Sequence, residues 1–338
     1  MLDGRSILIT GGTGSFGRAF VRDVLTKYKP RRLVIFSRDE QKQFAMAREL
    51  SPEKYPALRY FIGDVRDRER LRLALRGIDV VIHAAAMKHV PIAEYNPFEC
   101  IRTNVLGAEN VILASIDAGV KKVIALSTDK AANPINLYGA TKLCSDKCFV
   151  AGNHMSGEGG TRFSVVRYGN VVGSRGSVVE FFQEQVKNGV TELPITDERM
   201  TRFFLTIKQG VDFVLDRLVH MQGGEIFIPK IPSMRIVDLA RAIGPDCTTK
   251  EVGIRPGEKL HEVLLPYDEA RNTLEFTNHY TVHPALSWFE RDQHLFEDGE
   301  LGRALPPDFK YASDSNPQWM DPQELLDHLA VERPLLVA

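Results

Sequence analysis

The chain of 338 residues lacks the features that mark membrane and secreted proteins. No stretch reaches the roughly 18 consecutive apolar residues that a membrane span requires. The first residues, Met1–Thr10, contain no charged region followed by a long apolar one, as a secretory signal would. We therefore expect a cytoplasmic protein with no membrane partner.

Cysteine is scarce, and histidine forms no recognisable ligand set. The four cysteines are scattered without a C-x-x-C pair, which argues against a disulfide framework (Cys100, Cys144, Cys148 and Cys247). His279 and His283 are four residues apart, but no third ligand is nearby. We expect no metal site. The two tryptophans, Trp288 and Trp319, fall in the tail and are expected to anchor the core or a subunit contact.

Neither sign of charge dominates. Lys and Arg number 43 and Asp and Glu number 44, so the net charge is −1 and gives no reason to expect nucleic acid as a partner. An anionic ligand would need a local site. The 43% hydrophobic and 26% charged composition is typical of a folded globular protein and excludes a collagenous or disordered chain.

Short apolar runs alternate with amphipathic stretches over the first 170 residues or so. The runs are rich in β-branched residues without alternation, as in parallel strands buried on both faces. Helical spacing covers the stretches between them (15–28, 39–50, 67–76, 96–118 and 137–156). The pattern predicts an α/β fold, a Rossmann-like doubly wound parallel sheet.

The rhythm breaks after about Gly173, where Gly and Pro separate short, weakly patterned segments. We expect residues 1–172 to form the nucleotide-binding domain and residues 173–338 to form mainly a smaller substrate-binding domain with a tail. The helix 207–221 and the strand 225–228 are expected to return to the main sheet.

A glycine-rich turn follows the first predicted strand and opens the first helix. Its spacing, T-G-x-x-G-x-x-G, lets backbone amides approach a pyrophosphate at a helix N-terminus. The residues expected to bind a dinucleotide here are Gly11, Thr13, Gly14, Ser15, Phe16 and Gly17.

The end of the second strand bears on which dinucleotide is bound. Ser37 and Arg38, with Lys42 one turn on, suit a ribose 2′-phosphate and favour NADP over NAD. Asp39 and Glu40 leave NAD open, because an acidic side chain there could hold a 2′-hydroxyl. Asp64 and Val65 are expected beside the adenine, and the small residues Ala84, Ala85 and Ala86 would leave room for the cofactor backbone.

The fifth strand ends in Ser127-Thr128-Asp129-Lys130, and Tyr138 and Lys142 follow on one helix face. The Lys142 ammonium and an oxidised nicotinamide would lower the pKa of Tyr138 and let it act as a base. A Y-x-x-x-K pair placed after this fold's glycine turn resembles the extended short-chain dehydrogenase/reductase superfamily.

The Thr128-Asp129-Lys130 segment resembles the nucleotide-sugar 4,6-dehydratases, which add an acid and a base to the superfamily's Tyr and Lys. Lysine in the third place is similar to the group acting on UDP-N-acetylglucosamine, and most similar to its C5-inverting members in pseudaminic acid synthesis. Segments along the chain share this resemblance (Thr128 to Lys142, Tyr168 to Val171, Met200 to Phe204, Arg255 to Leu260 and Tyr311 to Pro317).

The resemblance implies roles for individual residues. Tyr138 and Lys142 would act with NADP at C4, and Thr128 would bind O4. Lys130 would take the C5 proton, with its pKa depressed by burial next to Lys142, and Asp129 would assist loss of the C6 hydroxyl. Asp129 and Lys130 could instead form a simple salt bridge in which Lys130 holds the substrate. The residues expected to hold the UDP-sugar are Lys88, Asn170, Arg202, Arg255 and Glu258, because a pyrophosphate is bound by cations and amides.

Three alternatives remain at this stage. A UDP-sugar C4 epimerase or a C5-retaining dehydratase would use the same Tyr138 and Lys142, although an epimerase has no need of Asp129 and Lys130. A regulatory NADP sensor is a non-enzyme alternative, which the intact Tyr–Lys pair disfavours. The resemblance also implies a homo-oligomer built on dimers through the helix 96–118, with a hexamer as the larger form.

Overall fold

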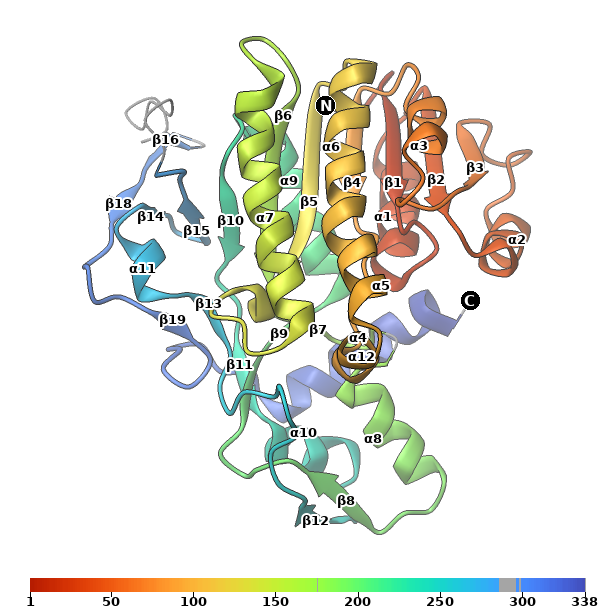
Figure 1. Ribbon diagram of the computed structural model, residues 1–338. Helices are drawn as coiled ribbons and strands as arrows, with labels where there is room; N and C mark the ends of the chain where they lie inside the picture. Colours follow the sequence, from red (N-terminus) through yellow and green to blue (C-terminus); the bar gives the residue numbers. More distant parts are fainter. Residues whose placement is uncertain (175, 286–295, 298, 338) are drawn as a thin grey trace.

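The computed structural model describes residues 1–174, 176–285, 296–297 and 299–337, and a large sheet with helices on both faces lies at its centre (Figure 1). Within these residues the sheet has ten strands, in the order β18-β14-β15-β10-β6-β5-β4-β1-β2-β3. The six strands from β3 to β6 run parallel in the strand order of doubly wound dinucleotide-binding folds. The predicted fold class is confirmed.

The parallel strands follow the predicted apolar runs: β1 (Ser6–Thr10), β2 (Arg32–Ser37), β3 (Leu58–Ile62), β4 (Val80–His83), β5 (Lys122–Thr128) and β6 (Arg162–Tyr168). Every residue of β1 and β4 is buried, because helices cover both faces. β4 ends at His83, so Ala84, Ala85 and Ala86 lie beyond the strand rather than in it.

Two layers of helices enclose the sheet: α1 (Ser15–Lys27), α2 (Glu40–Glu49), α3 (Arg68–Ala74), α4 (Val90–Tyr95), α5 (Pro97–Ile101), α6 (Gly107–Ala118), α7 (Leu137–Ser156) and α9 (Ile207–His220). In Figure 1, α6 and α7 stand in front of the sheet, while α1 and α9 lie behind it. Because the strands from β1 to β6 are parallel, their carboxyl ends all lie at the same edge of the sheet, the lower edge in that view.

The predicted single helix 96–118 is interrupted. A π-helical turn, Arg102–Leu106, separates α5 from α6. Within it Asn104 is 2% exposed and faces inward, where its amide hydrogen-bonds both backbone groups of Met87. Such π turns often occur at functional sites, because they re-aim one side chain without ending the helix.

Four strands from the second half of the chain extend the main sheet: β10 (Ile226–Pro229), β14 (Thr273–Glu275), β15 (His279–Val282) and β18 (Arg303–Ala304). β10 pairs in parallel with β6, and β15 pairs antiparallel with β10. The core of the sheet is thus continuous across both halves of the chain.

A smaller lobe lies below the carboxyl ends of the strands (Figure 1). It contains α8 (Val178–Lys187), β8 (Glu192–Ile195), α10 (Ile236–Ile243), β12 (Thr248–Glu251) and α12 (Pro322–Val337). Its own apolar core includes Phe182, Leu193, Leu239 and Leu325.

Short strands join the smaller lobe to the sheet: β7 (Asn170–Val171), β9 (Thr201–Leu205), β11 (Ser233–Arg235), β13 (Val263–Leu265) and β19 (Tyr311–Ala312). The remaining elements are α11 (Tyr267–Ala270), β16 (Phe296–Glu297) and β17 (Glu300–Leu301).

The two tryptophans of the tail have different outcomes. Trp319 is 48% exposed, so the prediction that it anchors the core is wrong, and a subunit contact stays a prediction. Trp288 lies outside the described residues.

Candidate active site

The end of β5 turns directly into the predicted catalytic segment. Thr128 closes the strand, and Asp129–Ala131 form one 3-10 turn, in which the Lys130 amide donates to the Thr128 hydroxyl at 3.4 Å. A Cβ at Gly139 would come within 2.1 Å of the Lys130 carbonyl oxygen. Because glycine has no such atom, α7 can bring Tyr138 against the end of β5.

Lys130 lies between two carboxylates. Its Nζ donates to Asp129 Oδ1 at 3.0 Å and is 3.2 Å from Glu262 Oε1. Asp129 Oδ1 also accepts from the Thr128 hydroxyl at 3.0 Å. Sequence reasoning missed Glu262, which comes just before β13. The one signal that could have found it was its place two residues beyond the Arg255–Leu260 segment.

Two further cations complete a buried group. Glu262 Oε1 lies 3.9 Å from Arg202 Nε, and Glu262 Oε2 lies 3.6 Å from Lys259 Nζ. No side chain of the group is more than 23% exposed. We call it the acid–base cluster, in which three cations face two acids: Asp129, Lys130, Arg202, Lys259 and Glu262.

The pKa values of the two acids of this cluster shift in opposite directions. Burial raises the pKa of Asp129 above its usual value; the charge of Glu262 adds to this rise, and Lys130 opposes it. Burial by itself also favours a neutral Glu262, but Lys130, Arg202 and Lys259 hold the pKa of Glu262 below its usual value. The neutral form is therefore more favoured for Asp129 than for Glu262.

The expected depression of the Lys130 pKa is wrong for this arrangement. Burial does favour the neutral amine, but the charges of Asp129 and Glu262 outweigh it and raise the pKa of Lys130. The sequence argument considered burial without the second carboxylate, which comes from a distant segment.

Tyr138 and Lys142 share one face of α7, and both are buried. Burial raises the pKa of Tyr138 to about 12, although Lys130 and a hydrogen bond with Thr128 oppose it. Burial lowers the pKa of Lys142. The protein alone thus raises the pKa of the phenol, and its main opposing cation is Lys130. The predicted lowering includes the charge of a bound nicotinamide and stays a prediction.

A second buried network, which sequence reasoning missed, lies on the other side of β5. Asp146 is one turn beyond Lys142 on α7; it accepts from the Ser127 hydroxyl at 2.7 Å and lies 3.5 Å from Arg167. Arg167, fully buried, donates to Glu269 at 2.6 Å. We call Lys142, Asp146, Arg167 and Glu269 the α7 cluster. It ties the strand end at Ser127 to the helix that carries Tyr138.

Charges in the α7 cluster are matched. Burial raises the pKa of Asp146, while Arg167 and Lys142 oppose this. Burial likewise favours a neutral Glu269, but Arg167 holds the pKa of that carboxyl below its usual value. The charge of Asp146 in turn opposes the effect of burial on Lys142.

The glycine turn after β1 has a conformation and a close packing that require glycine. Gly11 has φ +66°, and a Cβ there would lie 2.9 Å from the Ala85 nitrogen. The Thr10 hydroxyl accepts from the Ala84 and Ala85 amides at 3.2 Å each and lies 2.8 Å from His83 Nδ1. Burial lowers the pKa of His83 to about 3, so the ring is neutral and can accept the hydroxyl hydrogen.

The other predicted residues of this loop lie at the start of α1. Gly14 is the N-cap and provides no side-chain cap, so the first-turn amides face the loop. Phe16 stacks on Tyr168 of β6 with ring centroids 6.5 Å apart. The loop and the strand ends therefore share one edge of the sheet, along which Thr13, Ser15 and Gly17 also lie.

Asp39 at the end of β2 is engaged within the protein. Its carboxylate caps α2 by accepting from the Lys42 amide at 2.9 Å, and Lys42 Nζ lies 2.9 Å away. Hydrogen bonds from Lys42 hold the pKa of Asp39 below its usual value. The Ser37 hydroxyl accepts from Gln43 at 3.0 Å.

Arg38 is exposed beside these residues. Its guanidinium is 61% exposed and 3.8 Å from Asp64, which also pairs with Arg66 at 2.7 Å. Val65 is buried, and its carbonyl accepts from Asn110 of α6 at 3.0 Å. The structure thus brings Arg38, Lys42 and Asp64 to one corner, where the cations are accessible.

The predicted substrate residues lie at the carboxyl-end edge of the sheet, on the side of the smaller lobe. Arg202 is 6% exposed, and its guanidinium donates to the carbonyls of Thr201, Lys259 and Leu260 at 2.7 to 3.1 Å. It therefore braces the loop before β13 as well as facing the cluster. Glu258 accepts from Thr196 at 3.3 Å and lies 4.0 Å from Arg202.

Arg255 is exposed at the head of that loop, and Asn170 is half-buried in β7. Lys88 is exposed beyond β4, with Lys130 and Glu180 as electrostatic neighbours. Lys259, which was not singled out, donates to the Ala132 carbonyl at 2.7 Å. These contacts hold the Arg255–Leu260 segment against the end of β5.

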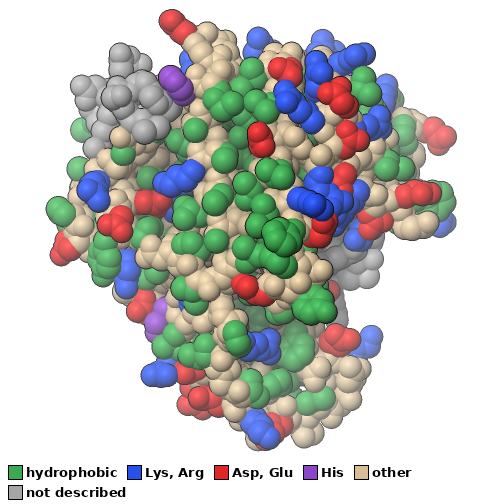
Figure 2. Space-filling model, in the orientation of Figure 1, with side chains coloured by type: hydrophobic (Ala, Val, Ile, Leu, Met, Phe, Trp, Pro, Cys, Tyr) green, Lys and Arg blue, Asp and Glu red, His purple; other side chains and the backbone are tan. Residues whose placement is uncertain are grey.

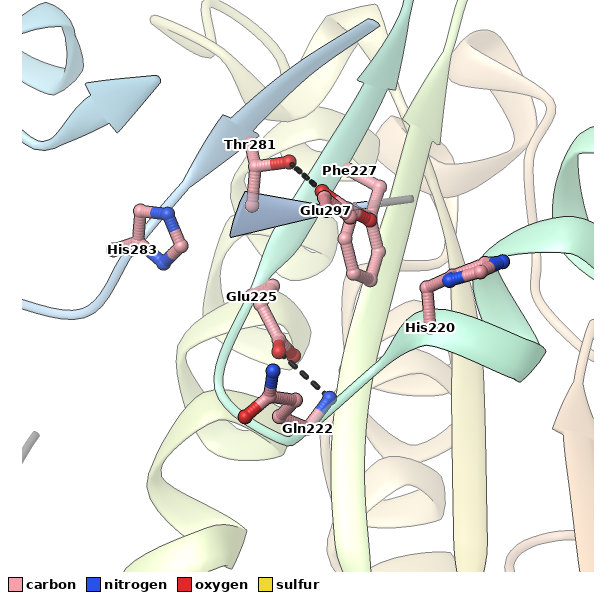
Figure 3. A pocket seen from close by; sticks show the side chains of 7 residues that line it. All are labelled: His220, Gln222, Glu225, Phe227, Thr281, His283 and Glu297. Atoms are coloured by element: carbon pink, nitrogen blue, oxygen red, sulfur yellow. Dashed lines mark hydrogen bonds between the residues drawn. The ribbon is translucent and has the colours of Figure 1, made fainter. Parts of the chain in front are cut away.

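A separate pocket lies at the other end of the sheet (Figure 3). Glu225 in its wall precedes β10 and accepts from Ser164, near the start of β6, at 2.6 Å. Its lining contains none of the predicted site residues (His220, Gln222, Glu225, Phe227, Thr281, His283 and Glu297). The pocket is therefore distinct from the candidate active site.

Over the described part of the chain, His, Cys, Asp and Glu side chains form no group of three or more that could hold a metal ion. No described helix has the length and hydropathy that crossing a membrane requires.

Comparison with known proteins gives full-length similarity. Residues 7–284 match the family model described as polysaccharide biosynthesis protein. The UDP-N-acetylglucosamine 4,6-dehydratase (inverting) of Campylobacter jejuni is 57% identical over 329 residues, 97% of this chain and 98% of that protein. The UDP-glucose 4-epimerase of Rickettsia akari is 43% identical over 314 residues, 90% of each chain.

A solved structure supports the same similarity. The X-ray structure of Pen from Bacillus thuringiensis superposes with a TM-score of 0.87 at 34% sequence identity, covering 98% of this chain and 99% of that one.

Proposed function

The chain belongs to the polysaccharide biosynthesis protein family, and we propose that it is a hydro-lyase that removes water from UDP-N-acetylglucosamine across C5 and C6 while inverting C5. The product would be UDP-2-acetamido-2,6-dideoxy-beta-L-arabino-hexos-4-ulose. The observation that carries the proposal is the acid–base cluster beside Tyr138, which adds Asp129 and Lys130 to the Tyr–Lys pair. A C4 epimerase has no use for that addition.

The proposed reaction begins at C4. Tyr138 takes the O4 proton, and the Thr128 hydroxyl orients O4. NADP⁺, held at the turn that contains Gly11 and Gly14, would supply the hydride acceptor for C4 and the hydride for C6. The positive charge of an oxidised nicotinamide and of Lys142 would lower the pKa of Tyr138 from about 12, as a base requires.

The resulting ketone makes the C5 hydrogen acidic. Lys130 takes that hydrogen as a proton, and Asp129 protonates the departing C6 hydroxyl. The raised pKa of Asp129 suits an acid. Lys130 is protonated between its two carboxylates, so its action as a base requires that it first lose a proton. Proton delivery to the opposite face of C5 gives the inversion.

The charge of the acid–base cluster suits a diphosphate. Its three cations outnumber its two acids, so the cluster has a positive surplus even with both acids ionised. Exposed Arg255 and Lys88 add charge at the same edge. Anionic groups bind best where such cations converge.

We propose NADP as the cofactor because of the corner at β2. Asp39 is engaged as a helix cap, whereas Arg38 and Lys42 are accessible cations. Arg38→Ala should weaken NADP binding by about 10- to 100-fold, the loss of a charge-assisted hydrogen bond, and leave NAD binding unchanged. Fluorescence titration with both nucleotides measures this. Equal effects on both would show that Arg38 does not read the 2′-phosphate.

The decisive test of the activity is a proton NMR spectrum of UDP-N-acetylglucosamine incubated with the protein in deuterated water. A new C6 methyl signal on an L-configured ring, with deuterium at C5, is the expected result. An unchanged C6 with inversion at C4 would indicate an epimerase, which the similarity to the Rickettsia akari protein makes the second candidate. A C6 methyl with retained C5 would indicate a retaining dehydratase. Cofactor binding without turnover would indicate an NADP sensor.

The assembly and setting are proposals too. We place the enzyme in the cytoplasm, at the first step of pseudaminic acid synthesis. Figure 2 shows hydrophobic side chains on the face that carries α4 to α7. Ile92, Tyr95, Phe98 and Leu106 are 46 to 87% exposed there, which suits a homodimer face. Light scattering after size exclusion would measure the mass, and a monomer would contradict the proposal.

A further inference from the structure

We propose that Glu262 is a positioning residue of the acid–base centre, which holds the negative charge opposite Lys130 and so leaves the proton on Asp129. This inference rests on the proposed dehydration. It assigns different roles to two acids that are far apart in the sequence: Asp129 is the proton donor, and Glu262 is the counter-charge to Lys130.

The contacts of Glu262 are those of an ionised carboxylate. It is 3% exposed, and both of its oxygens face cations: Oε1 faces Lys130 at 3.2 Å and Arg202 at 3.9 Å, and Oε2 faces Lys259 at 3.6 Å. Its backbone amide donates to the Ser313 hydroxyl at 2.9 Å, which fixes the start of β13. A buried carboxylate with three cations around it is charged in the resting enzyme.

Asp129 has fewer cations around it than Glu262. It is fully buried, and its Oδ2, like Oε2 of Glu262, has no hydrogen-bond partner among the described residues. Lys130 is its one direct cationic contact, and it shares that cation with Glu262. Ionising both of two carboxyl groups that share one lysine costs free energy, so the group with fewer cations around it retains a proton.

Groups from four elements face Asp129 and enter its titration. Lys130 and Arg202 favour its ionised form, and Glu262 favours its neutral form. Lys259 and Tyr138 also interact with it electrostatically. Together the groups come from the turn after β5, from α7, from β9 and from the segment before β13: Lys130, Tyr138, Arg202, Lys259 and Glu262.

The same placement gives Lys130 a route to its basic form. An N–H bond of the Lys130 ammonium breaks, and an O–H bond forms on Glu262 Oε1, 3.2 Å away, so no other reactant is needed. The neutral lysine then takes the C5 hydrogen as a proton, and the electron pair moves into the C4 ketone as an enolate. Asp129 gives its proton to the C6 oxygen; the enolate pair then forms a C5=C6 double bond as the C6–O bond breaks and water leaves.

Glu262→Gln tests the inference. The variant keeps the volume of the side chain and removes its charge. C5 hydrogen exchange into deuterated water should fall by about 10²-fold, a typical general acid–base contribution, while oxidation at C4 persists. Loss of the Glu262 charge should also lower the pKa of Asp129. Because activity needs the protonated acid, the alkaline limb of the elimination rate should move to lower pH.

Two matched variants separate charge from packing. Glu262→Asp keeps the charge and should restore the wild-type position of the alkaline limb. Glu258 lies in the same segment, but its carboxylate does not contact Lys130. Glu258→Gln should therefore change KM and leave the alkaline limb of the elimination rate at its wild-type pH. A Glu262→Gln enzyme with the wild-type exchange rate and an unmoved limb, or with a change in KM alone, would overturn the inference.

A measurement on the wild-type enzyme covers the case in which Glu262→Gln does not fold. The infrared spectrum at neutral pH should contain a carboxylic acid C=O band that Asp129→Asn lacks. Absence of that band would overturn the inference. If the wild-type enzyme forms no C6 methyl product, the proposed function fails; if it does and Glu262→Gln behaves like it, the inference alone fails.

Discussion

Two buried charge clusters flank the end of β5, and they differ in how their charges are balanced. The α7 cluster alternates cation and acid: Lys142, Asp146, Arg167 and Glu269. The acid–base cluster has three cations for two acids, and the pKa of Asp129 is raised whereas that of Glu262 is lowered. The first cluster begins at Ser127 and the second at Thr128, so adjacent residues point into opposite environments.

The difference separates a structural role from a chemical one. A balanced buried network holds elements in register, and losing one member leaves an uncompensated charge. An unbalanced network attracts an anionic ligand and keeps protons at unusual places. We therefore expect substitutions in the α7 cluster to change stability or the state of Lys142, and substitutions in the acid–base cluster to change the reaction.

The largest effect should come from Lys130→Met in the acid–base cluster. The variant lacks the base for C5, so exchange of the C5 hydrogen into deuterated water should fall by about 10²–10⁴-fold. Proton NMR measures that exchange. Lys259→Met, in the same cluster, should instead raise KM for the UDP-sugar. A Lys130→Met enzyme that exchanges the C5 hydrogen at the wild-type rate would rule out the base assignment.

Arg167→Met should break the α7 cluster. The variant leaves Asp146 and Glu269 without their buried cation, so the free energy of unfolding should fall by about 3–5 kcal/mol. Urea denaturation of the purified protein gives the value. The control is Arg303→Met, which removes a guanidinium that is 79% exposed and should leave the free energy of unfolding nearly unchanged. Equal losses for the two variants would contradict the comparison.

Asp146→Asn tests the comparison of the two clusters further, and its expected effect is smaller. The charge of Asp146 opposes the lowering of the Lys142 pKa by burial, so its removal should lower that pKa further. Lys142 would then lose its proton at lower pH, and the alkaline limb of C4 oxidation would move the same way. Reduced-nicotinamide absorbance in single turnovers follows this step. An unmoved limb would mean that Asp146 does not act on Lys142.

Sequence patterns predicted the parts of the site that are close in the chain. Thr128, Asp129 and Lys130 follow one strand, and Tyr138 and Lys142 share one helix face, so local periodicity was enough to group them. The outcome for Arg202 was different. Its type suggested a phosphate contact, but the structure engages its guanidinium with three backbone carbonyls, which no spacing in the chain reveals.

The sequence by itself determined the parallel sheet, the glycine turn and the Tyr–Lys pair, because each follows from a short-range repeat or from strand ends meeting at one edge. Only the tertiary structure decided that Glu262 faces Lys130 and that Arg167 joins Asp146 to Glu269. It also decided the direction in which the pKa of each buried group shifts. A pKa depends on burial and on charges from distant segments, and neither can be read from the order of residues along the chain.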